Sequence, residues 1–320
     1  MTLPLAPPVQ PQLARSAREL PHGDGWRYEP KWDGFRTIVF RDGEEVQLQS
    51  RNGRPMNRYF PEVVERLRGL PAERIVLDGE LIVVVDGAQE FDLLSQRIHP
   101  ARSRVELLAR ETPASFVAFD LLALEDEPLL ELPYEERRRR LEAVAAEPLE
   151  LTPVTSDGEA AGAWLTGVSE GVVAKRAEAP YRPGERTGMV KVKRVRTADA
   201  VVQAFRFGKE AGTVGSLILA MHDDGGELRT VGHTSGFNAR EKRELLTLLE
   251  PHRTYEQGAG EPSSWKSDEE LVWEGLRPEL VCEVAFDHIT GERIRHGAKF
   301  LRWRPDKRPE DCSLAQLRER

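Results

Sequence analysis

Apolar and polar positions in the first 196 residues alternate between strand-like and helix-like patterns. Short segments rich in β-branched residues and bounded by Gly, Asp or Asn predict strands, and RIVLDGELIVVV at 74–85 predicts a buried one. We expect further strands at 26–43, 44–53, 116–124, 170–176 and 188–196, and helices at 61–70 and 132–147. The turn between the first two of these strands is expected at Asp42-Gly43, and the arginine run 137–140 on a solvated helix face. This mixture predicts an α+β domain.

The pattern changes after Arg196. Three short strands are expected at 201–208, 215–222 and 227–235, the last two forming a hairpin over the Asp-Asp-Gly-Gly turn. A helix follows, with Asn238 as its N-cap and Glu241 placed to complete a capping box. Two more strands are expected at 278–289 and 298–304.

Five strands with one helix between the third and fourth are typical of an OB-type barrel, a common nucleic-acid-binding fold. We therefore predict two domains, 1–196 and 197–320, of which the second is the barrel. The proline-rich leader, residues 1–12, is expected to be extended or disordered.

Composition restricts the class of protein. Apolar residues make up 39% and charged residues 31%, which suits a globular chain and not a disordered one. No run approaches the roughly 18 consecutive apolar residues that a membrane helix needs, and the N-terminus has no pattern of a secretion signal. Cys282 and Cys312 lack metal-site spacing, so we expect reduced thiols in a cytoplasmic protein that does not bind membranes.

The charge is unevenly distributed. The net charge of −8 argues by itself against nucleic-acid binding. However, residues 175–196 hold eight Lys/Arg against two Glu, and residues 293–308 hold seven against Asp306 alone. Such dense basic segments in an acidic chain indicate local anion sites, the alternative being solvated surface charge.

Lysine is scarce, and six of the nine lysines fall in these segments or in the motif described next. This position marks them as candidates for chemistry that arginine cannot perform.

The motif KWDGFR, residues 31–36, contains the pattern KxDGxR. A free lysine has a pKa of about 10.4 and is a poor nucleophile at neutral pH. Burial beside other cations or a metal releases its proton, and the neutral amine can then attack an electrophile. The alternative is a turn lysine in front of a tight Asp-Gly pair.

KxDGxR resembles the first motif of the covalent nucleotidyltransferases, which include ATP-dependent DNA ligases, RNA ligases and mRNA capping enzymes. The further motifs of that superfamily have counterparts downstream in the same order: SRNG (50–53), DGE (78–80), FDLL (119–122), EGVVAK (170–175), KVK (191–193) and RPDK (304–307). One departure is Met189, where an aromatic residue often precedes the fifth motif. The chain resembles most the small ligase C of certain bacteria and the ligase domain of ligase D. The resemblance implies an adenylation domain followed by an OB-fold domain.

The same resemblance implies a role for each motif residue. Lys31 would form a covalent lysine–AMP intermediate from ATP. Around the nucleotide, the resemblance places Glu29 at the adenine amino group, Phe119 against the adenine face, Arg36 at the ribose or phosphate, Arg51 at the phosphate end, and Lys191 and Lys193 at the α-phosphate. Glu170 would hold a divalent metal, Mg²⁺ or Mn²⁺, while Glu80 contacts the ribose or the metal. In the OB domain, Arg304 and Lys307 would clamp the pyrophosphate, with Asp306 orienting them.

The expected activity is sealing of 5′-phosphate/3′-hydroxyl nicks in duplex DNA by a monomer that works in DNA repair at the bacterial nucleoid, alone or with other break-repair proteins. A DNA ligase is favoured over two relatives, an RNA ligase and a capping-type enzyme, by Glu29, SRNG and the strings VLDGEL and FDLL. A non-catalytic nucleic-acid clamp is the alternative from another class. It predicts substituted motif residues, and the chemical positions here are intact.

Overall fold

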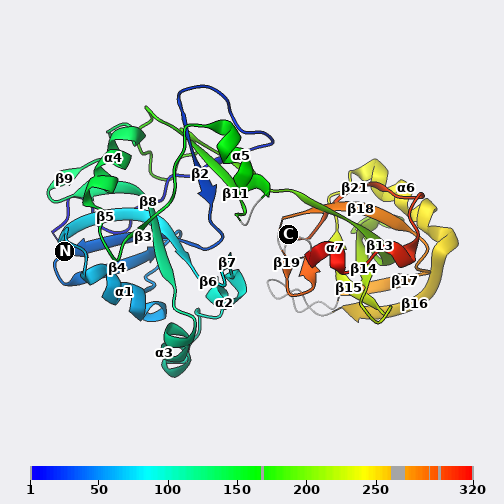
Figure 1. The fold of residues 1–320 in the computed structure, drawn as a ribbon. Helices are drawn as coiled ribbons and strands as arrows, with labels where there is room; N and C mark the ends of the chain where they lie inside the picture. Colours follow the sequence, from blue (N-terminus) through cyan, green and yellow to red (C-terminus); the bar gives the residue numbers. More distant parts are fainter. Residues whose placement is uncertain (1, 167–168, 261–270, 288, 295–296, 319–320) are drawn as a thin grey trace. The chain divides into compact units, whose positions relative to one another are not determined.

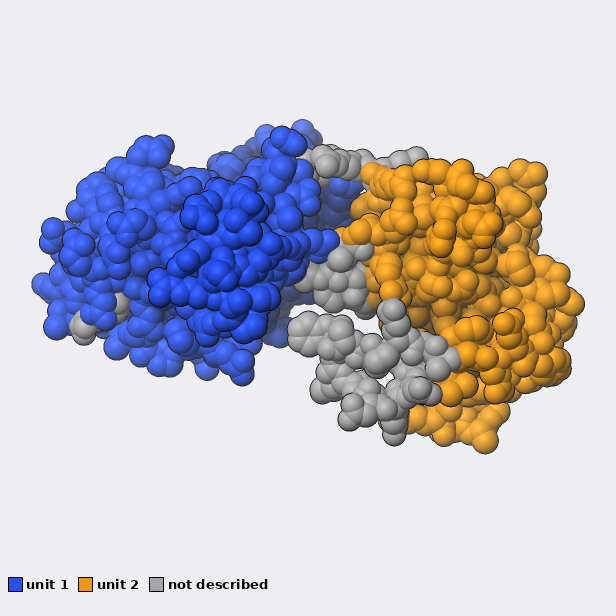
Figure 2. Space-filling view, turned by 90° about the horizontal axis from the view of Figure 1, so that it is seen from below, with its two compact units in different colours: residues 1–194 blue, residues 195–320 orange. Residues whose placement is uncertain are grey.

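The computed structural model describes residues 2–166, 169–260, 271–287, 289–294 and 297–318. The chain divides into two compact units, 1–194 and 195–320 (Figure 2). Both mix strands with short helices (Figure 1), so the predicted α+β fold class is confirmed. Among the described residues, none of the helices has the length and hydrophobicity that a membrane crossing requires.

The larger sheet of unit 1 has the strand order β10-β8-β5-β3-β4. All of its pairs are antiparallel except β10 with β8. Its strands are β3 (Phe35–Asp42), β4 (Glu45–Ser50), β5 (Arg74–Ile82), β8 (Ser115–Leu124) and β10 (Glu150–Leu151), and β9 (Glu127–Pro128) also pairs with β8. The helices of this part are α1 (Pro61–Arg68), α2 (Phe91–Ser95), α3 (Arg102–Glu111) and α4 (Tyr134–Val144); β6 (Val84–Val85) and β7 (Ala88–Gln89) form a small hairpin.

Successive side chains of a strand point to opposite faces of the sheet, and each face of this sheet carries an apolar layer. Val39 of β3 belongs to the main core, which also contains the apolar face of α1. Its neighbours Ile38 and Phe40 belong to a second cluster, and Leu3, Leu5 and Val9 of the leader pack against that cluster. The leader, residues 2–12, runs without regular secondary structure along this layer and is tied to it, for example where the amide of Val9 donates to Gln49 (3.0 Å).

A smaller sheet completes unit 1, in the order β1-β12-β11-β2. It consists of β1 (Arg15–Ala17), β2 (Trp26–Lys31), β11 (Gly171–Arg176) and β12 (Met189–Lys193), and α5 (Gly158–Thr166) packs against it. Two motif glycines permit close strand approach. A Cβ at Gly171 would lie 2.2 Å from the carbonyl oxygen of Val192, and one at Gly34 would lie 2.1 Å from that of Leu81. No side chain fits at either position, which explains glycine in both motifs.

Unit 2 is a closed barrel, as predicted. The long β13 (Arg196–Phe207) pairs with β14 (Val214–His222) on one side and with β18 (Val281–Phe286) on the other. β15 (Leu228–Thr234) pairs with β14, and β21 (Lys299–Trp303) pairs with β18. A parallel bridge between Thr234 and Ala298 closes the circuit. The helix α6 (Ala239–Leu249) lies between the third and fourth barrel strands in sequence and has the predicted capping box of Asn238 and Glu241.

Two strands of unit 2 were missed by the sequence analysis. β16 (Arg253–Gly260) and β17 (Leu271–Leu276) pair with each other, and β17 extends the sheet by pairing with β13 at Ala204 and Phe205. Their sequences are polar or interrupted by glycine, so the main-chain pairing supplied by β13 decides their conformation more than their own strand propensity does. Short elements complete the unit: β19 (Ile289–Thr290), β20 (Arg293–Ile294) and α7 (Ala315–Arg318).

The arginine run of α4 is only partly solvated, because one of its four arginines is buried, and this corrects the prediction. Arg137 is fully buried and forms a bidentate ion pair with Asp120 of β8, with N–O distances of 2.7 and 3.0 Å. Arg139 does face solvent, where it pairs with Glu136. The helix has a weakly amphipathic sequence, and a buried acidic partner on the adjacent strand draws one arginine inward.

Candidate active site

A cavity of about 190 Å³ opens in unit 1 between the two sheets and the leader. Its lining includes seven of the residues singled out from the sequence: Glu29, Lys31, Arg36, Arg51, Glu80, Phe119 and Lys191. Residues 11–14, which follow the proline-rich segment, contribute another part of the wall. Residues up to 180 positions apart in the sequence therefore line one cavity.

Lys31 is the last residue of β2 and is held against the start of β11. The amide of Glu170 donates to the carbonyl of Lys31 (3.1 Å), and the Lys31 ammonium forms an ion pair with the Glu170 carboxylate. Burial lowers the pKa of Lys31 to about 8, and the charges of Lys193 and Lys191 act in the same direction while Glu80 and Asp33 oppose them. The lowered pKa makes the neutral, nucleophilic form of this amine more accessible near physiological pH than it is for a free lysine.

Glu80 of β5 lines the same cavity as Lys31 and is close enough for its charge to act on the pKa of that amine. Burial raises the pKa of its carboxyl to about 7, while the positive charges of Arg36 and Lys31 oppose that rise. Glu80 can therefore be charged or neutral near pH 7, depending on what binds beside it.

Cations gather at one end of the cavity. Lys191 and Lys193 alternate with Val192 on β12, so their side chains leave the same face of the strand. Lys193 pairs with Glu170 at 2.9 Å. Burial, followed by the charges of Lys193, Arg51 and Arg186, lowers the pKa of Lys191. This concentration of positive charge fits a polyphosphate.

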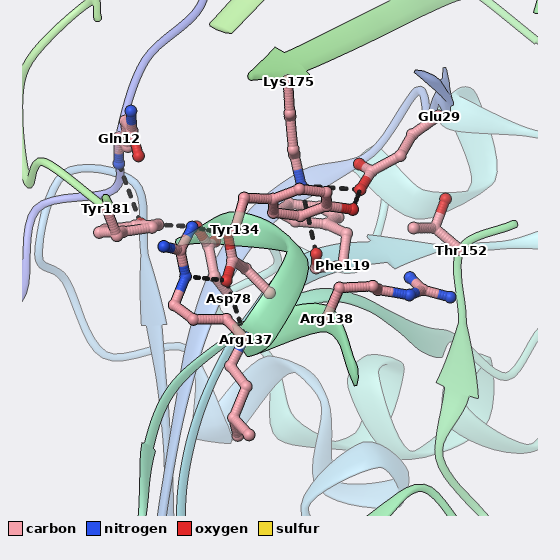
Figure 3. A network of polar contacts seen from close by, with 12 residues as sticks. Gln12, Glu29, Asp78, Phe119, Tyr134, Arg137, Arg138, Thr152, Lys175 and Tyr181 are labelled. Atoms are coloured by element: carbon pink, nitrogen blue, oxygen red, sulfur yellow. Dashed lines mark hydrogen bonds and ion pairs between the residues drawn. The ribbon is translucent and has the colours of Figure 1, made fainter. Parts of the chain in front are cut away.

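The opposite end of the cavity is a buried network around Glu29 (Figure 3). Oε1 of Glu29 accepts hydrogen bonds from the Tyr134 hydroxyl (2.5 Å) and from the Lys175 ammonium (2.9 Å). The Lys175 ammonium lies 4.7 Å from the ring centroids of both Phe119 and Tyr134. An aromatic face beside a fixed carboxylate is an arrangement that can bind a purine.

Arg36 contacts both Phe119 and the leader, since its guanidinium also donates to the carbonyl of Gln12 (3.3 Å). Its guanidinium forms a two-pronged ion pair with Asp78, both distances being 2.6 Å, and lies 4.4 Å from the Phe119 ring centroid. Tyr181 also donates to Asp78 (2.6 Å), and the amide of Gln12 donates to the Tyr181 hydroxyl (2.9 Å). Asp78 thus fixes the direction of Arg36.

The carboxylates of Glu80 and Glu170 both lie near Lys31 and are the candidate metal ligands. Within the ranges that the structure describes, no group of three or more His, Cys, Asp or Glu side chains could hold a metal ion. Mg²⁺ commonly uses one or two carboxylates and completes its shell with substrate phosphates. The two carboxylates therefore fit a metal that arrives with a nucleotide and do not form a closed protein site.

The RPDK residues lie in unit 2. Asp306 forms a two-pronged pair with Arg304 at 2.8 and 2.9 Å. Arg304 also pairs with Asp199 (2.8 Å), and Lys307 lies 4.0 Å from the same Asp199 carboxylate. Asp306 therefore orients Arg304 in this structure, while the acidic partner found for Lys307 is Asp199 of β13.

Sequence analysis missed several residues at this site. Tyr134 and Tyr181 lie outside every motif, and no local pattern marked them. Lys175 ends the EGVVAK motif and is one of the six lysines marked as candidates for chemistry, but it was given no specific role. Arg186 was treated as bulk charge, although it lines the cavity.

Comparison with protein families gives two matches. The model for the ATP dependent DNA ligase domain matches residues 10–193, and the model for the ATP dependent DNA ligase C terminal region matches residues 210–307.

Individual relatives are similar over most of this chain. DNA ligase C1 of Mycolicibacterium smegmatis is 47% identical over 334 residues, covering 99% of this chain and 96% of the relative. The multifunctional non-homologous end joining DNA repair protein LigD of Mycobacterium tuberculosis is 31% identical over 89% of this chain and 37% of its own length. The solved structure of mycobacterial DNA ligase D complexed with ATP and MES is 31% identical, with a TM-score of 0.54, and the match covers 95% of this chain and 97% of that one.

Proposed function

The chain belongs to the ATP-dependent DNA ligases, and on that premise we propose that it seals 5′-phosphate/3′-hydroxyl nicks in duplex DNA through AMP carried on Lys31. The observation that carries the proposal is the environment of Lys31: a buried amine with a pKa of about 8, at the wall of a cavity with a purine-binding end and a cationic end.

The first step is transfer of AMP from ATP to the enzyme. The neutral amine of Lys31 attacks the α-phosphorus, the bond to the bridging oxygen breaks, and pyrophosphate leaves with the electron pair. The nitrogen loses a proton and becomes a phosphoamide. Lys191 and Lys193 lie on one face of β12 and would neutralise the charge that builds up on the α-phosphate. Arg51, at the cationic end, would contact the outer phosphates.

Two further transfers complete the reaction. An oxygen of the 5′-phosphate at the nick attacks the AMP phosphorus, the P–N bond breaks, and Lys31 regains its proton. The 3′-hydroxyl then attacks the 5′-phosphorus, loses its proton, and displaces AMP. Arg36 is held by Asp78 beside Phe119, where it would contact the ribose of the nucleotide during these steps.

A divalent metal, Mg²⁺ or Mn²⁺, held by Glu170 and Glu80 together with phosphate oxygens, would supply further charge neutralisation. Glu170 makes ion pairs with Lys31 and Lys193. Arg304 and Lys307 of the OB-fold unit would assist the departure of pyrophosphate, with Asp306 fixing the Arg304 guanidinium.

We place this enzyme in DNA repair. Support comes from the similarity to LigD, a relative whose name includes non-homologous end joining, over 89% of this chain.

The deciding experiment compares sealing of four nicked duplexes that are identical in sequence. One is all DNA, and the others carry RNA on the 3′-hydroxyl side, on the 5′-phosphate side, or on the template strand. Efficient ATP-dependent sealing of the all-DNA nick supports the proposal. Sealing only when RNA flanks the nick would replace it with RNA ligation, and no sealing of any duplex would overturn it.

A further inference from the structure

We propose that Lys175 and Tyr134 are positioning residues that set the choice of nucleobase, because they fix one oxygen of Glu29 and leave the other to read the purine. The inference rests on the proposed function, since it takes the adenine of ATP to bind beside Glu29 and Phe119.

Both positioning residues act on the same atom. Lys175 and Tyr134 donate to Oε1 of Glu29 at 2.9 and 2.5 Å, from β11 and α4 respectively. Figure 3 shows the two side chains converging on that oxygen from different elements. Glu29 also lines the cavity, so a carboxylate held at Oε1 can turn Oε2 toward a ligand there.

The surroundings of Lys175 exclude a role as a phosphate ligand. Its side chain is only 4% exposed, and its ammonium also donates to the carbonyl of Phe119 (3.1 Å). The rings of Phe119 and Tyr134 enclose it further. Lys191 and Lys193 are much more open: the Lys193 side chain is 34% exposed and Lys191 is only half-buried. Lys175 therefore acts within the base-binding end of the cavity.

A buried arginine, Arg137, lies against the Tyr134 ring. Arg137, one turn further along α4, pairs with Asp120, the residue next to Phe119. Its guanidinium lies 5.8 Å from the Tyr134 ring and 5.7 Å from the Tyr181 ring. One buried cation thus lies against the rings of both tyrosines, of which Tyr134 donates to Glu29 and Tyr181 to Asp78.

This fixed geometry creates selectivity. An ionised carboxylate only accepts hydrogen bonds, so it favours the amino group at the purine 6-position and disfavours a carbonyl there. The preference is strong only when the carboxylate cannot turn away, because a rotating group would let water replace the lost bond. Lys175 and Tyr134 supply that restraint.

The test separates base readout from general stability. The protein is first freed of bound AMP with pyrophosphate. It is then incubated with ATP or with purine riboside triphosphate, which lacks the 6-amino group. The protein–nucleotide adduct is measured by intact mass. The quantity of interest is the ratio of kcat/KM for the two nucleotides. In the wild type a charge-assisted hydrogen bond to the amino group should make this ratio on the order of tenfold to a hundredfold.

Lys175→Met and Tyr134→Phe should bring this ratio close to one, with the loss appearing mainly in KM for ATP. Tyr181→Phe is the matched control, because it removes a hydroxyl from the same buried layer but on the Asp78 side. It should keep the wild-type ratio even if its overall rate falls.

The possible outcomes are distinct. If Lys175→Met and Tyr134→Phe slow both nucleotides equally and keep the ratio, the two residues are merely structural and the inference is wrong. If Tyr181→Phe also collapses the ratio, readout does not run through Oε1 of Glu29. If the wild type forms no adduct with ATP, the proposed function itself fails, independently of this inference.

Discussion

The amide of Glu170 donates to the carbonyl of Lys31 (3.1 Å), and the side chains of the same two residues form an ion pair. The main-chain bond fixes the spacing of the two side chains, because it belongs to the pairing of β2 with β11. Glu170 also pairs with Lys193 of β12. One carboxylate therefore connects the candidate nucleophile to the candidate phosphate ligands.

We expect Lys31→Ala and Lys31→Arg both to reduce transfer of labelled AMP to the protein to background. Arginine preserves the positive charge but cannot supply a neutral amine. Incubation with α-labelled ATP followed by denaturing electrophoresis measures the adduct. Lys209→Arg, at an exposed lysine of the other unit, is the control and should label normally. Wild-type labelling of either Lys31 variant would exclude Lys31 as the nucleophile.

Self-adenylation should depend on pH with a midpoint near the Lys31 pKa of about 8. Because the neutral amine attacks, the rate should rise about tenfold per pH unit below the midpoint and level off above it. Lys193→Met removes a cation that lowers this pKa and should move the midpoint to higher pH. Glu80→Gln removes a carboxylate that raises it and should move the midpoint to lower pH.

Single-turnover labelling at saturating ATP, from about pH 6 to about pH 9.5, measures these midpoints. The readout is the position of the midpoint and not the maximal rate, since both variants lose phosphate or ribose contacts. Shifts of both variants in one direction would contradict the assigned electrostatics.

Nucleotide choice should follow the Glu29 side chain. We expect the wild type to be labelled from ATP and poorly from GTP, and Glu29→Gln to accept GTP better, since an amide can donate to the purine carbonyl. Parallel labelling with the two α-labelled nucleotides gives the ratio. Equal labelling of the wild type would refute the adenine assignment and revive the capping-enzyme alternative.

Arg304→Ala and Lys307→Ala should slow self-adenylation on the order of a hundredfold, because each removes a charge that stabilises departing pyrophosphate. The same variants should still seal a nick that already carries a 5′-adenylate, since that step releases AMP. Glu170→Ala should slow both reactions, because phosphate neutralisation by a metal serves each phosphoryl transfer. Single-turnover sealing of a pre-adenylated nick is compared with labelling. Equal loss of both activities in the Arg304 and Lys307 variants would show that the sixth motif is not specific to one step.

Arg137→Ala should destabilise unit 1 by about 3–5 kcal/mol, because it leaves the Asp120 carboxylate buried without its partner. Arg139→Ala, two residues along the same helix, removes an exposed arginine and should change stability little. Urea unfolding of the full chain, monitored by circular dichroism, compares the two variants. Equal effects of the two substitutions would mean that the burial of Arg137 contributes nothing.

The sequence by itself predicted the family, the fold class and most of the longer strands. It missed helices α2, α3 and α5, and the strand predicted at 26–43 is two strands, β2 and β3, in different sheets. Short-range information sufficed where a rule is local: the capping box of α6 needs only Asn238 and Glu241 three residues apart, and it formed as predicted. The order of motifs likewise indicated the residues that the fold gathers around one cavity.

Only the tertiary structure decided which neighbours those residues have. Nothing around Tyr134 or Tyr181 in the sequence marks them, because their partners, Glu29 and Asp78, lie about a hundred residues away and are brought near by sheet pairing. Arg137 and Arg139 are chemically identical in a run of four, and only the position of Asp120 on the adjacent strand buries one of them. The lowered pKa of Lys31 has the same origin, since desolvation and the charges of Lys191 and Lys193 exist only once β2, β11 and β12 have assembled.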